Sequence, residues 1–270
     1  MNSLATDMQL HKNGNFTYSA TRLNELGATD YTLVTISSDN SYSVEKFKDA
    51  MEEALKESVS SCKYSKRADN LMLRHTTFND TVVEHHGFKL LAQINENDYT
   101  NSLNPDGSTA LYDAALDAAN ATGDYAKQLL DASFNVNGVI FFITDGDNNA
   151  SLANTKMVKD AIAKLHKKNK DDGQNKMESL VTILIAVNVN DPYILMRLED
   201  FKNEVGINKF INLKDASKKS LAKLAEFVSK SISASSQALG TGGPSKQIMI
   251  NNSSNITDAV DALDNDSLVI

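Results

Sequence analysis

The hydrophobic positions of this chain alternate between two spacings over most of its length. Short continuous runs of apolar, β-branched residues predict buried strands, and apolar residues at every third or fourth position predict helices with one buried face. The expected strands are 31–36, 71–78, 138–144, 180–189 and 209–213, with 81–84 returning as an antiparallel edge strand. The expected helices are 44–59, 110–130, 152–165, 192–205 and 217–232.

Regular alternation of strands and helices predicts a doubly wound α/β domain, Rossmann-like, with a mostly parallel sheet of six strands and helices on both faces. One antiparallel edge strand completes the expected sheet. We expect an N-terminal extension over 1–30, the domain over 31–232, and a Gly/Ser-rich linker with an acidic tail over 233–270. The tail is either disordered or a docking peptide, because Ile256, Val260 and Leu263 fall at helical spacing.

Composition narrows the classes of protein without naming one. A formal net charge of -8 argues against nucleic-acid binding, which requires a basic face. No apolar run approaches the length of a membrane span, and residues 1–15 lack the hydrophobic stretch of a secretory signal. Cys62 is the only cysteine, which fits a reducing compartment. We therefore expect a cytoplasmic protein, or one carried inside a virus or bacterium; the oligomeric state stays open.

Three polar segments lie where strands end or helices begin. They are 39–43 after the first strand, 105–112 before the alanine-rich helix, and 145–149 after strand 138–144. Ligands of open α/β sheets collect at the carboxyl ends of strands where the strand order reverses, so these segments meet if they flank that reversal. Their carboxylates and hydroxyls are hard oxygen donors, which suit Mg²⁺, Mn²⁺ or Ca²⁺. The candidate metal ligands are Asp39, Ser41, Ser43, Thr109 and Asp145.

Each segment alone has a simpler interpretation as a helix cap or an ordinary turn. Together, and in this order, Asp39-x-Ser41-x-Ser43, Thr109 within Gly-x-Thr-x-Leu, and Thr144-Asp145-Gly146 resemble the metal-ion-dependent adhesion site of von Willebrand factor A (vWA) domains. The resemblance covers roughly 31–232. Parts of the chain are also similar to small stand-alone vWA proteins of bacteria and phages, some of them found in tellurite-resistance gene clusters.

The resemblance implies a role for each ligand. Ser41 and Ser43 would bind the metal directly, and Asp39 and Asp145 would anchor the ion. Thr109 would be a ligand that binds the metal in one state of the site and not in another. One coordination position would remain for an Asp or Glu of a protein partner, or for solvent. A rim that contacts the partner would comprise Asn40, Tyr42, Asp106, Asp147 and Asn148. Many family members carry Gly where Tyr42 stands, and integrin β subunits are similar to this chain in carrying Tyr.

The expected function is metal-dependent binding of an acidic side chain of a partner protein, without catalysis. One alternative is a virion or scaffold component whose metal only stabilises loops. Another is a Mg²⁺-dependent phosphoryl-transfer enzyme built on Asp39, although no phosphate-binding loop accompanies that residue. An acid of the tail, such as Asp258 or Asp261, could also occupy the site until a partner displaces it. The pair His85-His86 is expected in a surface turn, and His75 is expected to be partly buried in a strand.

Overall fold

The protein was analysed as a computed structural model, which describes residues 7–13, 16–166 and 177–241. Within these residues eight strands form one sheet in the order β1-β2-β5-β4-β3-β6-β7-β8. The strands are β1 (Met8–Asn13), β2 (Phe16–Thr21), β3 (Asp30–Asp39), β4 (Leu71–Phe78), β5 (Val82–Leu90), β6 (Asn135–Thr144), β7 (Ser179–Val187) and β8 (Lys209–Leu213). The helices are α1 (Lys48–Lys63), α2 (Leu111–Asp131), α3 (Thr155–His166), α4 (Pro192–Val205) and α5 (Lys218–Thr241). Short 3₁₀ helices include η2 (Tyr42–Phe47) and η5 (Glu96–Tyr99).

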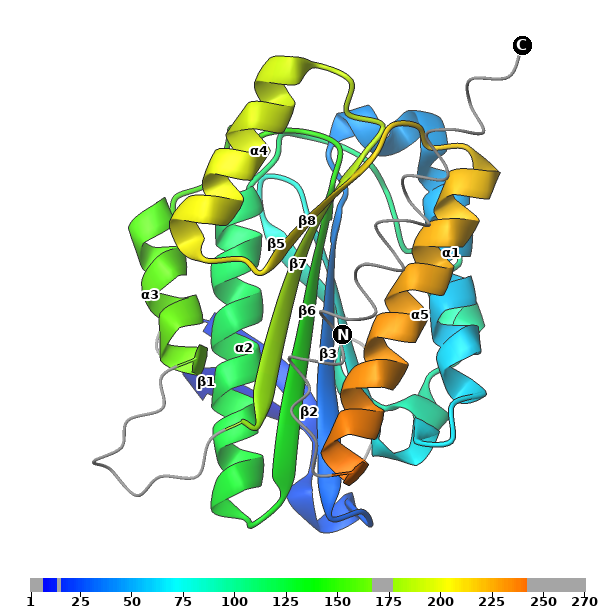
Figure 1. Ribbon diagram of the computed structural model, residues 1–270, viewed down its shortest axis with the longest axis vertical. Helices are drawn as coiled ribbons and strands as arrows, with labels where there is room; N and C mark the ends of the chain where they lie inside the picture. Colours follow the sequence, from blue (N-terminus) through cyan, green and yellow to red (C-terminus); the bar gives the residue numbers. More distant parts are fainter. Residues whose placement is uncertain (1–6, 14–15, 167–176, 242–270) are drawn as a thin grey trace.

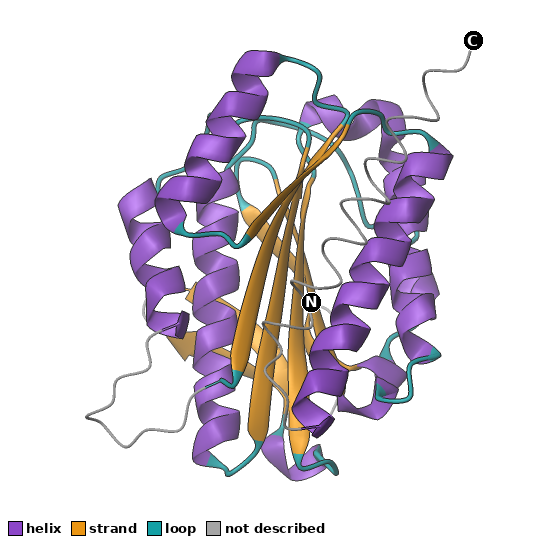
Figure 2. Ribbon diagram, in the orientation of Figure 1, coloured by secondary structure: helices purple, strands orange, loops and turns teal. Residues whose placement is uncertain are grey.

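The central strands are parallel and the helices cover both faces of the sheet. β4, β3, β6, β7 and β8 run parallel, and β5 pairs antiparallel with β4. Figures 1 and 2 show α1 and α5 on one face of the sheet, with α2, α3 and α4 on the other. The predicted fold class, a doubly wound α/β domain with a mostly parallel sheet, is confirmed.

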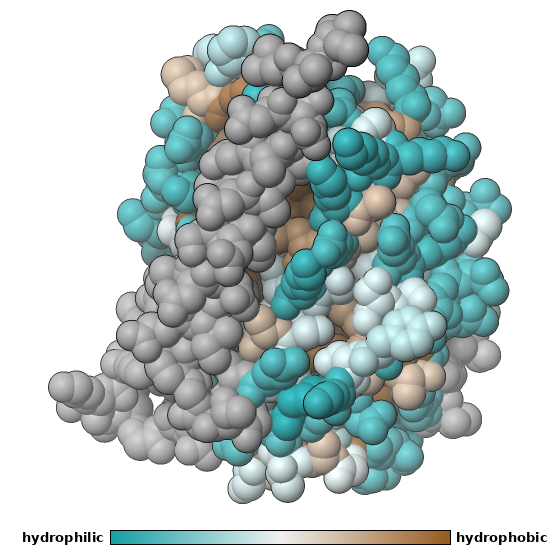
Figure 3. Space-filling view, turned by 45° about the vertical axis from the view of Figure 1, so that its right-hand side comes forward, coloured by the Kyte–Doolittle hydropathy of each residue, from teal (hydrophilic) through white to brown (hydrophobic). Residues whose placement is uncertain are grey.

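The core has a hydrophobic layer on each face of the sheet, because successive side chains of a strand point to opposite faces. In β6, Phe141 packs in the layer under α1 and α5, and Phe142 packs under α2, α3 and α4. Strands β6 and β7 are mostly apolar since both of their faces are buried, whereas β3 and β4 also bury polar residues, among them Thr35, Ser37 and Arg74. Figure 3 shows a mainly hydrophilic outer surface beside the grey atoms, with hydrophobic residues in small separate areas. No helix among the described residues is both long enough and apolar enough to cross a membrane.

The number of strands and the position of the edge were predicted wrongly. The sheet has eight strands instead of six, because part of the expected N-terminal extension forms the antiparallel hairpin β1–β2. That hairpin lies beyond β5, so β5 is not an edge strand. It contacts β5 very closely: a Cβ added to Gly87 would lie 1.7 Å from the carbonyl oxygen of Ser19. Only glycine permits this approach, and a glycine inside a strand is a weak signal from sequence alone.

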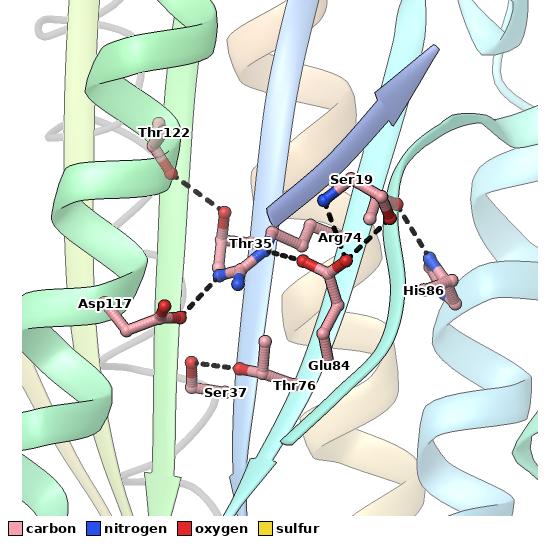
Figure 4. A network of polar contacts seen from close by, with 10 residues as sticks. Ser19, Thr35, Ser37, Arg74, Thr76, Glu84, His86, Asp117 and Thr122 are labelled. Carbon is pink, nitrogen blue, oxygen red and sulfur yellow. Dashed lines mark hydrogen bonds and ion pairs between the residues drawn. The ribbon is translucent and has the colours of Figure 1, made fainter. Parts of the chain in front are cut away.

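A buried arginine joins the hairpin to the rest of the domain (Figure 4). Arg74 of β4 is 1% exposed and donates from Nε to Glu84 of β5 (2.7 Å) and from Nη1 to Asp117 of α2 (2.8 Å). Glu84 also accepts hydrogen bonds from the backbone N–H (2.9 Å) and the hydroxyl (2.6 Å) of Ser19 in β2. The ion pairs of Arg74 therefore link β4, β5 and α2, and the hydrogen bonds of Glu84 extend this link to β2.

Helix boundaries differ from the expected ones at two places. The first predicted helix begins as the 3₁₀ helix η2, and α1 follows it to Lys63. The last helix continues to Thr241, so 233–241 is helical although a linker was expected there. Ser235 and Ser236 are buried in that extension. The tail expected beyond it lies outside the described residues.

Candidate metal centre

The strand order reverses between β3 and β6, at the centre of the sheet. β3 pairs in parallel with β4 on one side and β6 on the other, so the loops that leave their carboxyl ends diverge and leave a crevice. Asp39 is the last residue of β3, and Thr144 is the last residue of β6. The condition that would bring the three polar segments together is therefore met.

Asp39 is held rigidly at the base of this crevice. Its side chain is 1% exposed. One carboxylate oxygen accepts the backbone N–H of Ser41 (2.8 Å) and the other accepts the hydroxyl of Thr144 (2.6 Å). The carboxylate is thereby fixed in orientation by the loop that follows β3 and by the end of β6.

The two serine hydroxyls connect the β3 loop to the β6 loop. Ser43 Oγ donates to Asp145 Oδ1 (2.7 Å), and Ser41 Oγ lies 3.2 Å from Ser43 Oγ. Because the single hydroxyl proton of Ser43 is used on Asp145, Ser41 donates to Ser43. Ser41 occupies the N-cap position of η2 but makes no side-chain capping hydrogen bond. The interpretation of these serines as helix caps is therefore wrong.

Thr109 is placed against the third segment. A Cβ added to Gly146 would lie 3.9 Å from Thr109 Oγ1, so this hydroxyl lies beside the residue that follows Asp145. The backbone of Thr109 donates to Asn149 Oδ1 (2.7 Å) and accepts from the Asn149 N–H (3.0 Å). Thr109 does not cap α2, whose N-cap residue is Ala110 without a side-chain hydrogen bond.

The loop before Thr109 is held by Asn40 and by an unusual glycine. Asn40 accepts the N–H of Asp106 on its carbonyl oxygen (3.0 Å) and the N–H of Asn104 on its side chain (2.8 Å). Gly107 has a φ of 71°, and a Cβ added there would lie 2.2 Å from the Asp80 carboxylate. A left-handed backbone without room for a side chain requires glycine at this position.

The electrostatics of the site favour a bound cation. Burial, together with the nearby charge of Asp39, raises the pKa of Asp145 to about 6. Burial also raises the pKa of Asp39. Among the described residues neither carboxylate has an ion-pair partner, so their repulsion is opposed only by hydrogen bonds. Two desolvated carboxylates surrounded by hydroxyl oxygens fit a hard divalent ion.

The donor set is mixed, with carboxylates in the minority. Within the described part of the chain, no three His, Cys, Asp or Glu side chains gather where they could hold a metal ion. This site contains two such side chains, and its remaining side-chain donors are the hydroxyls of Ser41, Ser43 and Thr109. A metal held here would be bound by two carboxylates, which match the charge of a divalent ion, and by neutral hydroxyl oxygens.

The five residues expected to form the rim divide into two groups. Tyr42 is 72% exposed and Asp106 is exposed, so both are accessible to a partner. Asp147 instead accepts from Arg197 Nε of α4 (3.0 Å). The side-chain oxygen of Asn40 accepts the backbone N–H of Asn104, and that of Asn148 accepts the backbone N–H of Tyr112 in the first turn of α2.

Four further residues shape the site without having been assigned a role from the sequence. They are Thr144, Asn149, Asp80 and Arg197. Thr144 lies in the Thr144-Asp145-Gly146 motif and Asn149 lies in the polar segment 145–149, so local sequence indicated that both lie near the site. Local sequence did not indicate Arg197, because its contact with Asp147 joins residues 50 positions apart in the sequence.

Comparisons with known proteins find likeness at the level of structure. No protein-family model and no curated protein matches this sequence. Among solved structures, the PilB minor pilin from Streptococcus sanguinis matches with a TM-score of 0.55 and 14% identity, over 84% of this chain and 66% of the pilin. Proximal thread matrix protein 1 from the mussel byssus matches with a TM-score of 0.53 and 17% identity, over 77% of this chain and 47% of the mussel protein. This chain thus spans less than two thirds of each.

At these identities the comparisons show the fold alone. The likeness extends over most of the described domain, and the pilus adhesin SpaC from Lactobacillus rhamnosus GG matches over the same 84% of this chain with a TM-score of 0.53 and 13% identity, covering 34% of the adhesin. The α/β fold predicted from the sequence is one that these solved structures share.

Proposed function

We propose that this protein is a metal-dependent protein-interaction module. A divalent cation, Mg²⁺ or in its place Mn²⁺ or Ca²⁺, would bind between the β3 and β6 loops and accept a carboxylate from an Asp or Glu of a partner protein. The observation that carries the proposal is the pair Asp39 and Asp145, two desolvated carboxylates without an ion-pair partner among the described residues. Such an arrangement is costly unless a cation is bound.

Each side chain has a distinct part in this proposal. Asp39 and Asp145 would neutralise the ion, and Ser41 and Ser43 would supply neutral oxygens from one loop. Thr109, in the loop just before α2, would supply a third neutral oxygen. The metal supplies Lewis acidity when bound, and with small hydroxyl ligands at its other positions it would take a further carboxylate oxygen from outside.

The exposed neighbours of the site would contact the partner directly. Tyr42 combines an apolar ring with a hydroxyl, a side chain that is enriched at protein interfaces. Asp106 adds an exposed carboxylate on the loop that Asn40 anchors. We expect these two residues to affect partner choice more than metal binding.

We place the module in the cytoplasm, as the sequence predicts. Cys62 is buried and free, which agrees with a reducing compartment. Catalysis is not part of the proposal, because the three polar segments contain no histidine, no thiol and no phosphate-binding loop.

An experiment with Mn²⁺ alone tests whether the site is open to a partner. Water-proton relaxation of the Mn²⁺-loaded full chain should show at least one rapidly exchanging water on the metal, and acetate in excess should displace it. The variant Asp39→Asn should remove the effect, whereas Asp106→Asn should retain it. Bound Mn²⁺ without an exchangeable water would contradict the proposal and favour a metal that only stabilises loops.

A further inference from the structure

Three histidines lie together on the face of the sheet that α1 covers. His75 of β4 is fully buried, and its ring centroid lies 5.0 Å from that of His85 and 6.2 Å from that of His86, both in β5. Tyr99 of η5 lies 5.2 Å from His75 by the same measure. The pairing of β4 with β5 is irregular at this point, which brings both consecutive histidines against His75. His85 and His86 lie in strand β5 and not in the expected turn, although His85 is exposed as expected, and His75 is more deeply buried than expected.

The hydrogen bonds of this histidine cluster suit neutral imidazoles. Among the described residues, neither ring nitrogen of His75 has a hydrogen-bond partner. His86 donates from Nδ1 to the carbonyl oxygen of Gly87 (3.0 Å), so its Nε2 accepts from the Tyr99 hydroxyl (2.8 Å). Figure 4 shows His86 beside Ser19. His85 Nε2 lies 2.9 Å from Thr77 Oγ1. A proton added to His86 Nε2 would occupy its lone pair, so this nitrogen could no longer accept the hydrogen bond from Tyr99.

No charge around the cluster compensates an added proton. None of the three histidines forms an ion pair within the described residues. Arg74 adds a positive charge from β4, and Lys89 adds another from β5. On η5 and α1 the titratable groups that act on His86 or Tyr99 are Asp98, Glu96 and Cys62. Of these, Asp98 alone favours protonation of His86, and it does so without contact.

We propose that His75, His85 and His86 form an acid-sensing element, whose protonation separates β5 and the segment through η5 from β4 and α1. Charging the desolvated imidazole of His75 or His86 costs free energy, and a charge on the exposed ring of His85, which stacks on His75, adds repulsion. Opening the cluster to water removes both penalties. Segment 82–103 is the part proposed to move, because it contributes two of the three histidines and, through η5, the Tyr99 ring that lies over His75, while β4 is fixed between β3 and β5.

The direction of the pH effect follows from the histidine equilibria. Burial lowers the pKa of His86 to about 4 and holds the pKa of His75 well below its usual range. The opened segment exposes histidines with an ordinary pKa of about 6.5. The closed form is therefore fully favoured above about pH 6.5, and it loses stability as the pH falls from there towards about 4.

The element is coupled to the metal centre through two backbone hydrogen bonds. The carbonyl oxygen of Phe78, at the end of β4, accepts the N–H of Asn40 (2.7 Å). The carbonyl oxygen of Asn79 accepts the N–H of Ala110 (2.7 Å). Displacement of the β4–β5 turn would disturb both loops that flank the site. This consequence rests on the proposed function, whereas the opening itself does not.

Backbone hydrogen exchange of the full chain, in the presence of a metal chelator, tests the proposal independently of the metal site. After correction for intrinsic rates, peptides within 82–103 should open at least about tenfold more at pH 5.0 than at pH 7.0, because each unit of pKa depression corresponds to a factor of ten. The variants His86→Gln and His75→Phe should reduce this ratio. Glutamine can still donate to Gly87 and accept from Tyr99, so His86→Gln removes the titration with least disturbance.

A matched control and a second measurement make the outcome decisive. His11→Gln changes a histidine that stacks on Tyr18 in the distant hairpin, and it should leave the exchange ratio of 82–103 unchanged. If His75→Phe does not fold, nuclear magnetic resonance titration of the wild-type histidines replaces it. Equal protection of 82–103 at both pH values, a rise spread evenly over all peptides, or ordinary titration of His75 and His86 in the folded protein would each overturn the proposal.

Discussion

At the scale of single residues, the metal centre is defined by two side chains whose charges oppose one another. Asp145 keeps a pKa of about 6 because it is desolvated and lies near Asp39. Ser43 offsets part of that penalty by donating a hydrogen bond of 2.7 Å to it. Without a cation, the folded protein therefore carries an unfavourable charge pair that the unfolded chain does not have.

The substitution Asp145→Asn should consequently stabilise the metal-free protein, by about 1 kcal/mol, because a neutral amide removes the repulsion from Asp39. Thermal unfolding in chelator should show the higher Tm. Addition of Mg²⁺ should raise the Tm of the wild type and leave that of the variant unchanged. As a control, Asp147→Asn loses the ion pair with Arg197 and should keep the response to Mg²⁺. A less stable Asp145→Asn variant that still responds to Mg²⁺ would contradict this account.

At the scale of elements, the site depends on loops held in uncommon conformations by the strands and helices around them. Gly107 combines a φ of 71° with a Cβ position 2.2 Å from the Asp80 carboxylate. Gly206, which ends α4, has a similar φ of 82° but nothing within 4 Å of its Cβ position. Comparing the two glycines therefore distinguishes the cost of a left-handed backbone, which both have, from the cost of a steric clash, which only Gly107 has.

Replacement of Gly107 by alanine should therefore cost more than the same change at Gly206. We expect about 1 kcal/mol for Gly206→Ala, from the left-handed backbone alone, and about 2–3 kcal/mol for Gly107→Ala. Urea unfolding measures both values. Only Gly107→Ala should also weaken Mg²⁺ binding, because its loop leads directly to Thr109. Equal costs, or intact metal affinity in Gly107→Ala, would show that this loop does not shape the site.

Local patterns along the sequence predicted most elements and indicated the residues of the proposed metal site, while tertiary contacts decided the rest. Strand 71–78 and helix 192–205 were predicted with their observed bounds, because their apolar spacing is regular. The ligand segments were found because each stands directly at the end of an element. The β1–β2 hairpin was missed since its stability comes from distant contacts, such as Tyr18 on Phe88 and Tyr125. The histidine cluster depends on irregular strand pairing, which no periodicity reveals.

At the scale of the whole molecule, the charges around the buried Arg74 join the β1–β2 hairpin to the rest of the sheet and to α2. This guanidinium pairs with Glu84 and Asp117, and Glu84 in turn holds Ser19 of the hairpin. Removal of a buried positive charge leaves its partners desolvated and unpaired, which is far more costly than the loss of an exposed ion pair.

The variant Arg74→Met should destabilise the protein by about 3–5 kcal/mol, as measured by urea unfolding. The matched control is Lys127→Met, which removes an exposed pair with Asp131 on α2 and should cost no more than about 0.5 kcal/mol. Similar costs for the two variants would mean that the Arg74 contacts do not hold the hairpin to the domain.

The central claim is that the crevice between the β3 and β6 loops binds one divalent cation through Asp39, Ser41, Ser43, Thr109 and Asp145. Calorimetric titration of the full chain with Mg²⁺ at neutral pH tests it most directly. The account predicts saturable binding of one ion per chain, lost in Asp39→Asn and kept in Asp106→Asn. Absence of binding by the wild type, or binding that survives Asp39→Asn, would contradict it.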